Sequence, residues 1–283
     1  MTVASSSDRN QRSPAPAPAE LSDREFQRIR AWLFDETAIE LSDHKRSLVT
    51  SRLLRRVRAR EAGSFGDYFD LLQASDEEDE RCLARDLLTT NETSFFREPK
   101  HFEFLRKHVL PARTSGRPFR VWSAAASSGE EPYTIAMDLA EHLGLDAPWE
   151  VLGSDISERV LERARRATYD IEGAELTPDY LKKYCLRGVG DQRGLLRIQR
   201  RIRERVRFQS IALHESLPQI GRFDVVFLRN VLIYFGSSTR QQVISRIEAL
   251  IAPNGYLFVS HSETLQGITH RLASVRPSIY RRS

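Results

Sequence analysis

The stretch VWSAAASSGEEPYTIA, residues 121–136, decides the fold class and raises the first functional question. An apolar run ends in small residues and one glycine, two glutamates follow, and the chain then takes up helical spacing. This strand-to-helix turn has neither the Gly-Lys-Ser/Thr of a phosphate loop nor the three spaced glycines of a dinucleotide site. Two adjacent carboxylates would also repel a phosphate. The turn therefore suits a neutral or cationic ligand, unless it is an ordinary turn whose glutamates complement the helix dipole.

Short apolar runs alternate with helical segments from residue 119 onward. The expected strands read FRVWSA, WEVLGSD, RVRFQS, FDVVFL and GYLFVS, and the expected helices cover residues 131–142, 157–169 and 237–251. This alternation predicts an α/β domain with an open, mostly parallel sheet buried on both faces. We assign it residues 117–283. Glycines and strand-like runs interrupt the alternation at residues 172–203, where we expect a small antiparallel β-subdomain insertion.

The first part of the chain is expected to be helical. Residues 20–90 show helical periodicity without strand-like runs, and Ser22 with Glu25 predicts a capping box at the first helix. Residues 91–116 are expected to form a linker that contains a helix beginning near Pro99. Residues 1–19, rich in Ser, Ala and Pro, predict a disordered tail.

One helical segment of the all-α domain, DHKRSLVTSRLLRRVRA at residues 43–59, has a basic stripe. At 100° per residue its apolar side chains share one arc, and its basic side chains lie on or beside the opposite arc. The stripe consists of Lys45, Arg52, Arg55, Arg56 and Arg58. We expect it to be nearly free of acidic partners and to bind an acidic surface; the alternative is a solvated helix face.

Composition excludes several classes of protein. The 283 residues carry a formal net charge of +4, which is compatible with nucleic acid or with an acidic protein surface. Cys82 and Cys185 form no disulfide framework or zinc motif, so we expect a reducing cytoplasm. The seven histidines have no metal-ligand spacing, and no apolar run approaches the ~18 residues of a membrane span. We therefore expect no metal and no membrane insertion.

Polar residues stand where the predicted strands end, which is where open α/β sheets bind ligands. Asp155 follows the second strand, where it can accept hydrogen bonds from ribose hydroxyls, while Arg229 and Asn230 follow the fourth. A nucleoside with a positive charge and an amino group, but without phosphates, fits this crevice. S-adenosylmethionine is such a molecule.

Several long motifs resemble the CheR chemotaxis-receptor methyltransferases. They are VWSAAASSGEEPYTIA, GSDIS, FDVVFLRNVLIYF, TTNETSFFRE and FVSHSE, and the resemblance extends over residues 21–280. It implies a class I, Rossmann-like methyltransferase domain that uses S-adenosylmethionine, preceded by an all-α domain. The implied activity forms methyl esters on glutamate side chains of membrane chemoreceptors and releases S-adenosylhomocysteine.

The resemblance also implies the residues of the cofactor site. Carried over position by position, the contacts are Asn91, Thr93, Arg97, Glu131, Asp155, Asn230, Val231 and the pair Ala212 and Leu213. The family has Asn where this chain has Ala212, so backbone groups or a water would have to replace one polar contact near the adenine. Asn91 and Thr93 have an alternative role as caps of the next turn. Arg97 has the alternative role of a surface ion-pair partner of Glu98 or Glu103.

Methylation of a carboxylate needs no general base, because glutamate is ionised at pH 7. The catalytic candidates are therefore Arg97, which would steer or neutralise the incoming carboxylate, and Tyr234, which either positions substrate or packs as a strand-end aromatic. Two other readings remain. A nucleic-acid methyltransferase would need Asp/Asn-Pro-Pro-aromatic where this chain has RNVL, so we expect no nucleic-acid partner. A non-catalytic adaptor that binds the cofactor is less firmly excluded.

The expected partners are the cytoplasmic domains of chemoreceptors. The basic stripe is the candidate substrate surface. Within the insertion, the glycine-rich stretch would accept a receptor's C-terminal pentapeptide as an added strand, or it is a plain hairpin. The residues assigned to this tether are Arg187, Gly188, Gly190, Gly194 and Arg197. We expect a monomer.

Overall fold

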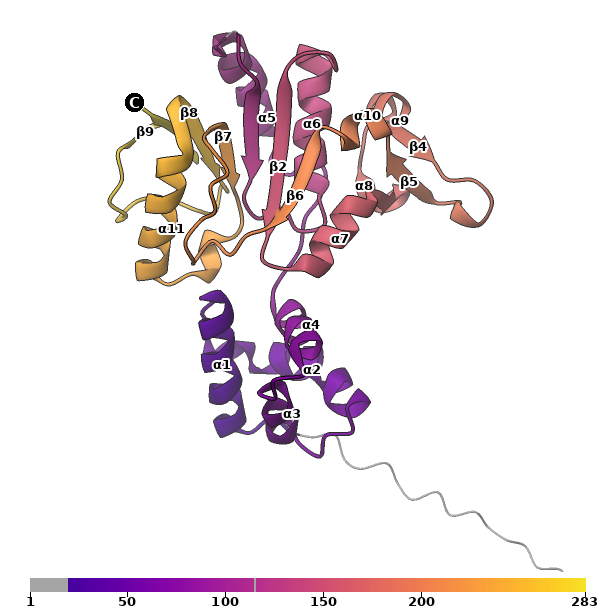
Figure 1. The fold of residues 1–283 in the computed structure, drawn as a ribbon, viewed down its shortest axis with the longest axis vertical. Coiled ribbons are helices and arrows are strands. Elements are labelled where there is room, and N and C mark those ends of the chain that lie inside the picture. The colour runs from indigo at the N-terminus through magenta and orange to yellow at the C-terminus, as the bar shows by residue number, and fades with distance from the viewer. Residues whose placement is uncertain (1–19, 115) are drawn as a thin grey trace, which may run out of the picture.

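The computed structural model describes residues 20–114 and 116–283; the predicted tail at 1–19 lies outside them. Figure 1 shows a small helical domain on one side of a larger α/β domain. The helical domain consists of α1 (Asp23–Thr37), α2 (Arg46–Ala59), α3 (Phe65–Leu72) and α4 (Glu78–Leu88). The capping box is present: the Glu25 carboxylate accepts from the Ser22 amide at 2.8 Å, and the Glu25 amide donates to the Ser22 hydroxyl at 3.3 Å.

The α/β domain contains a seven-stranded sheet. Its strands are β1 (Phe119–Ser123), β2 (Trp149–Asp155), β6 (Val206–Ser210), β7 (Phe223–Leu228), β8 (Ile251–Val259), β9 (Leu272–Arg276) and β10 (Ile279–Arg282). The order is β6-β2-β1-β7-β8-β10-β9, and the first five are parallel. The prediction of a mostly parallel sheet is confirmed. The antiparallel edge formed by β9 and β10 was not predicted, because only Leu272 of β9 is buried and the strand lacks an apolar run.

Two apolar layers enclose the sheet, which explains why its strands read as continuous apolar runs. On one face Val121, Val151 and Phe227 pack with α6 (Glu130–Leu143). On the other face Trp122 and Val226 pack with α11 (Ser237–Leu250). Neighbouring residues of one strand thus belong to opposite layers. Among the helices that the structure describes, none has the length and apolar character needed to cross a bilayer.

Two predicted helices differ in the structure. The helix after Ser157 is α7 (Glu158–Arg166), which ends earlier than the predicted residue 169 because Ala167 adopts a left-handed conformation with φ 52°. The helix from Pro99 is α5 (Pro99–Phe104), followed by a π-helical turn (Leu105–Val109) and a 3₁₀ turn (Leu110–Ala112).

The predicted antiparallel subdomain is present as a three-stranded sheet of order β3-β5-β4. Its strands are β3 (Thr168–Asp170), β4 (Cys185–Arg187) and β5 (Leu195–Ile198), with α8 (Ile171–Ala174), α9 (Pro178–Tyr184) and α10 (Arg200–Arg203) beside them. The first strand begins at Thr168, before the predicted start at 172, because the residues that follow α7 pair with β5. The subdomain projects from the side of the main sheet (Figure 1).

The helical domain contacts the loop that follows β7. Ile39 forms an isolated antiparallel bridge with Phe235, and the Glu40 amide donates to the Tyr234 carbonyl at 2.9 Å. On another side, Arg159 of α7 donates to the Asp86 carboxylate of α4 at 3.1 Å. These contacts hold the helical domain beside the crevice at the carboxyl ends of the strands.

Candidate active site

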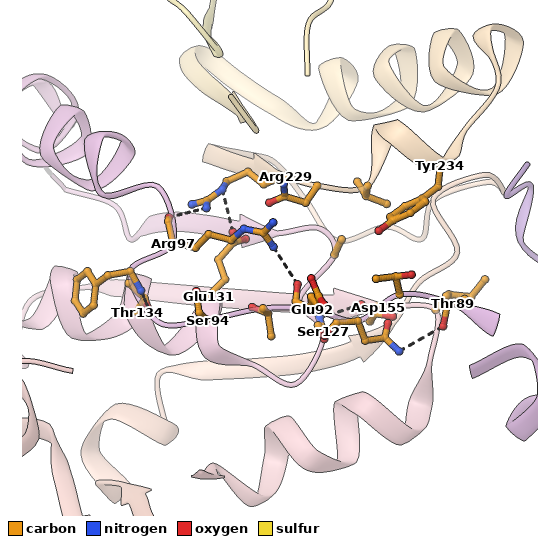
Figure 2. A pocket seen from close by; sticks show the side chains of 18 of the residues that line it. Thr89, Glu92, Ser94, Arg97, Ser127, Glu131, Thr134, Asp155, Arg229 and Tyr234 are labelled. Atoms are coloured by element: carbon orange, nitrogen blue, oxygen red, sulfur yellow. Dashed lines mark hydrogen bonds and ion pairs between the residues drawn. The ribbon is translucent and has the colours of Figure 1, made fainter. Parts of the chain in front are cut away.

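A cavity opens where β1, β2 and β7 end, and the segment that joins the two domains forms one of its walls (Figure 2). The structure brings together seven of the nine predicted cofactor contacts in its lining, together with Tyr234. They are Asn91, Thr93, Arg97, Glu131, Asp155, Asn230 and Val231. Ile39 adds a side chain from the helical domain. The cavity is therefore built by both domains, which sequence patterns within either domain do not reveal.

A second, more apolar cavity adjoins the first. The two share Ile39, Ala125, Asp155, Ile156 and Val231 in their walls. Leu213, the eighth predicted cofactor contact, lines only this second cavity, next to Ile211 and Phe235. Ala212, the ninth, lines neither of the two. A polar and an apolar space thus meet at the Asp155 carboxylate.

Asp155 is fixed by the backbone of two turns. Its Oδ2 accepts from the Ser127 amide at 2.9 Å and its Oδ1 from the Ser157 amide at 3.0 Å. Burial raises the pKa of Asp155, and these backbone amides oppose the shift. Ser127, in the turn after β1, has a left-handed conformation with φ 47°. Because an ionised carboxylate offers about four lone-pair positions, Asp155 can fix the turn and still accept bonds from a ligand.

The turn after β1 requires the glycine that the sequence places there. Gly129 has φ 96°, and a Cβ at this position would lie 2.7 Å from the Cβ of Ala164 in α7. Directly after it, α6 begins with Glu130 and Glu131. Glu131 turns toward the cavity, whereas Glu130 accepts from the Ser128 hydroxyl at 2.7 Å.

A buried arginine joins two carboxylates behind the cavity. The Arg229 side chain is 1% exposed, and its Nε lies 3.4 Å from Oε2 of Glu131 and 3.4 Å from Oε2 of Glu98. Its Nη2 donates to the carbonyl of Arg97 at 2.6 Å. Burial raises the pKa of Glu131, and Arg229 opposes this shift. Burial would also raise the pKa of Glu98, but the Ser260 hydroxyl and Arg229 together lower it.

The loop after β7 is held by a carboxylate that sequence reasoning did not assign a role. The Glu263 carboxylate accepts from the Asn230 amide at 3.0 Å and from the Ser260 amide at 2.8 Å. Asn230 has φ 57°, and its side-chain amide donates to the Ser260 hydroxyl at 2.8 Å. Backbone conformations of this kind cost free energy and tend to occur at functional sites. An acidic residue just after an apolar strand was the available sequence signal.

Arg97 and Tyr234 face the same cavity. Figure 2 shows their side chains and that of Asp155 directed toward one space. Arg97 donates to the Glu92 carbonyl at 3.0 Å, and within residues 20–114 and 116–283 it forms no ion pair with Glu98 or Glu103. The alternative of a surface ion pair for Arg97 is therefore wrong. Tyr234 is half-buried in the cavity wall.

A cluster of side chains has the spacing of metal ligands, and it includes Glu98, a partner of Arg229. In the described part of the chain, Glu98, His101 and His261 bring possible ligand atoms within 4.8 Å of one another. Burial lowers the pKa of His101 to about 3, and the Arg229 charge acts in the same direction. Since Arg229 already neutralises Glu98, a cation at this position would be repelled by the guanidinium.

The basic stripe of α2 is only partly as expected. Lys45, Arg55 and Arg58 are exposed. Arg56 instead forms two hydrogen bonds with the buried Glu80, at 2.9 and 2.6 Å, so the expectation that the stripe lacks acidic partners is wrong for this residue. Arg52 donates to the carbonyls of Leu88 and Thr89, at 3.2 and 2.9 Å. These two arginines hold α2 against α4, Arg56 near its start and Arg52 at its end.

The two adjoining cavities match the two ends of S-adenosylmethionine. The first is lined by charged and hydroxyl groups, the second mainly by apolar side chains, and Asp155 belongs to both, so there is one polar and one apolar space for the two ends of the cofactor. With the open, mostly parallel sheet, this geometry defines a class I methyltransferase that uses S-adenosylmethionine.

Comparison with known proteins identifies the family. Residues 91–280 match "CheR methyltransferase, SAM binding domain", and residues 24–89 match "CheR methyltransferase, all-alpha domain". The chain belongs to the CheR methyltransferase family. It is 42% identical over 264 residues to the chemotaxis protein methyltransferase of Escherichia coli, covering 92% of this chain and 91% of that protein. It is 41% identical to the protein of that name from Salmonella typhimurium, over 92% and 90% of the two chains. It is 42% identical to chemotaxis protein methyltransferase 2 of Pseudomonas aeruginosa, over 90% and 92%.

Proposed function

We propose that this protein methylates glutamate side chains on the cytoplasmic domains of chemoreceptors, as a monomer in the cytoplasm, and so acts in chemotactic adaptation. S-adenosylmethionine supplies an electrophilic methyl group, and S-adenosylhomocysteine is the second product. The observation that carries the proposal is a cofactor cavity lined by Arg97, which has no ion-pair partner among the residues that the structure describes, in a chain similar to chemotaxis methyltransferases along almost its whole length.

Four carboxylates in or beside the cavity already have partners, which agrees with a reaction that needs no general base. Asp155 and Glu263 accept from backbone amides, whereas Glu131 and Glu98 share Arg229. His101 is buried and neutral at pH 7, because its pKa is lowered to about 3. The chain's task is therefore to align and desolvate a nucleophile that is already ionised.

Arg97 is the proposed contact for the incoming carboxylate, and Tyr234 the proposed group that positions it. Arg97 has spare donors, because within the described part of the chain its side chain donates only from Nη1, to the Glu92 carbonyl. Its backbone is held by the Arg229 bond to its carbonyl, so the side chain projects from a fixed point. Tyr234 is anchored in the same way by the Glu40 amide.

The α2 stripe is the proposed docking surface for the receptor. It adjoins the cavity, because Arg52 donates to the carbonyl of Thr89 and Thr89 lines the cavity. The exposed charges of Lys45, Arg55 and Arg58 would then meet acidic side chains of a receptor helix while one glutamate enters the cavity. Arg52 and Arg56 would contribute mainly by holding this surface in place.

The insertion is the proposed tether for a receptor's C-terminal peptide. β4 is an edge strand of the small sheet; Leu186 within it is 56% exposed, and Val189 just after it is 80% exposed. Main-chain groups at such an edge can pair with an added strand, and the Arg187 and Arg197 side chains suit its carboxylates. We expect micromolar binding of a Trp-x-x-x-Phe carboxy-terminal peptide, roughly −8 kcal/mol.

Substitution of the turn glycines tests the tether. A Cβ at Gly188 would lie 1.9 Å from the Gln192 carbonyl oxygen, while Gly190 and Gly194 have φ of 58° and 91°. Gly188→Val with Gly190→Val should therefore distort the turn and abolish peptide binding in a fluorescence anisotropy titration, without changing affinity for S-adenosylhomocysteine. If the wild type shows no binding up to millimolar peptide, the tether is wrong, although the methylation proposal is unaffected.

The methylation itself is tested with labelled cofactor. Membranes that contain the host's chemoreceptors are incubated with the protein and methyl-labelled S-adenosylmethionine, and washed protein is then treated with mild base. We expect the label to enter receptor protein and to leave as methanol, since methyl esters hydrolyse in base. Label that resists base, or that enters nucleic acid, would contradict a carboxylate substrate.

A further inference from the structure

The apolar cavity beside Asp155 is the part of the cofactor site that suits adenine. Its walls are formed by aliphatic and aromatic side chains, among them Ile156, Ile211, Leu213, Val231 and Phe235. Adenine is the only aromatic part of S-adenosylmethionine, and the charged end of the cofactor has its partners in the neighbouring cavity. An apolar slot alone would hold a flat ring but would not distinguish one base from another.

Three polar side chains reach this apolar cavity, and two of them already have partners. Thr37 donates to the Leu33 carbonyl at 2.6 Å and accepts from the Ile39 amide at 3.1 Å. Asp155 accepts from two backbone amides and lies at the junction with the other cavity. Neither side chain is free to turn toward the edge of a base.

The third polar side chain is His214, whose hydrogen-bonding capacity is unused. Within residues 20–114 and 116–283, its ring forms no hydrogen bond, and the Glu215 carboxylate lies 3.7 Å from Nε2, beyond hydrogen-bond distance. The side chain is 14% exposed and lines the cavity two residues after Ala212. Burial lowers the pKa of His214, which favours the neutral ring. A neutral imidazole presents one donor and one acceptor, and the adenine edge carries both kinds of group.

We propose that His214 recognises the adenine edge of the cofactor in this protein. It would take over the polar contact that an asparagine at position 212 would supply, since Ala212 has no polar side chain and does not reach either cavity. The proposal concerns the cofactor alone and is independent of which substrate is methylated.

A binding experiment that crosses protein variants with ligand variants tests this role. Wild type and His214→Leu are titrated calorimetrically with S-adenosylhomocysteine and with its 6-deamino, 1-deaza and 7-deaza analogues, each of which lacks one polar group of the base. We expect the leucine variant to bind S-adenosylhomocysteine roughly fivefold more weakly, the factor expected for one lost hydrogen bond. For the analogue that lacks the group bound by His214, wild type and variant should bind equally.

Two controls separate recognition from a change in the fold. His108→Leu alters an exposed histidine outside both cavities and should leave all four affinities unchanged. If His214→Leu does not fold, His214→Ala carries the same comparison. The proposal is overturned if either His214 variant binds S-adenosylhomocysteine as tightly as wild type, or if it weakens binding of all four ligands by the same factor.

Discussion

The cavity and the basic stripe are both rich in charged side chains. Five of those around the cavity have partners within the fold, whereas three of those in the stripe are exposed to solvent. Around the cavity, the buried Arg229 pairs with Glu98 and Glu131, whose side chains are 14% and 13% exposed, and the Asp155 and Glu263 carboxylates accept from backbone amides. In the basic stripe, Lys45 just before α2 and Arg55 and Arg58 on α2 are exposed to solvent. A buried charged group needs a partner within the fold, whereas an exposed charged group is solvated and remains available to bind another molecule. We therefore assign the cavity to the cofactor and the stripe to the receptor.

Arg52 and Arg56 show that sequence position alone does not tell whether an arginine is fixed within the fold or available to a partner molecule. Both lie in the stripe, but Arg56 binds the buried Glu80 and Arg52 binds carbonyls at the end of α4. The predictions below test the contrast between fixed and available charges, in order of the expected effect on folding stability.

Replacement of Arg229 should have the largest effect. Arg229→Met leaves the half-buried Glu98 and Glu131 carboxylates without their shared, buried cation, and breaking a buried ion pair costs about 3–5 kcal/mol. Urea denaturation of the variant measures this loss. Arg58→Met, at an exposed position of α2, is the matched control and should stay within about 0.5 kcal/mol of wild type. If the two variants were equally stable, the distinction between the paired charges at the cavity and the exposed charges of the stripe would be wrong.

Asp155→Ala should have a smaller effect on the fold and a large one on the cofactor. The Ser127 and Ser157 amides lose their acceptor, which costs about 1–3 kcal/mol. Affinity for S-adenosylhomocysteine should fall at least tenfold, by calorimetric titration of the folded variant. Asp191→Ala, on the exposed turn of the insertion, should bind normally. An Asp155 variant with unchanged affinity would show that the crevice is not the cofactor site.

The buried His101 predicts a moderate loss of stability in mild acid. Its pKa is lowered to about 3 in the folded chain, against about 6.5 for an unperturbed histidine. Between these values the unfolded chain binds the extra proton, so the free energy of unfolding falls as pH falls, by about 1 kcal/mol per pH unit between pH 6 and 5. The lowered pKa of Glu98 acts in the same direction, below its unfolded value.

Urea denaturation of wild type and His101→Gln at pH 5, 6 and 7 measures this dependence. The variant should have a flatter profile between pH 6 and 5, since it lacks the titrating ring. Parallel profiles for the two proteins would show that His101 does not remain neutral in the fold.

Charge reversal on the exposed stripe should hardly change stability. Arg55→Glu with Arg58→Glu is expected to stay within about 0.5 kcal/mol of wild type and to keep its affinity for S-adenosylhomocysteine. The KM for receptor should rise severalfold, because like charges would then face each other. Arg52 is excluded from this variant, since its loss would also free two carbonyls of α4. Unchanged methylation kinetics would leave the stripe as a solvated face.

The sequence predicted those features that depend on neighbouring residues. Apolar runs predicted β1, β2, β7 and β8, because strands covered on both faces have few polar residues, and β6 was also predicted although only Val206 is buried in this edge strand. Asp155 and Glu131 could be placed in the crevice because they follow strand ends. β9 could not be predicted, since its pairing with β10 depends on the sheet edge more than on its own side chains.

Other features depend on how distant segments pack. Ile39 reaches the cavity only because the helical domain contacts the loop after β7. Arg56 forms a hydrogen bond with Glu80, which lies on another helix 24 residues later in the sequence. His214 was not assigned a role because its position in the cavity wall depends on the path of the chain after β6. No local pattern contains this information.

The most direct test of the central claim is to map the methyl group on the receptor. Receptor membranes are incubated with the protein and S-adenosylmethionine, the receptor is digested, and modified residues are located by mass spectrometry before and after mild alkali. We predict methyl groups on glutamate side chains of the cytoplasmic helices, removed by alkali, and absent when the Asp155→Ala variant replaces wild type. Methyl groups on other residue types, or alkali-stable modification, would contradict the proposed function.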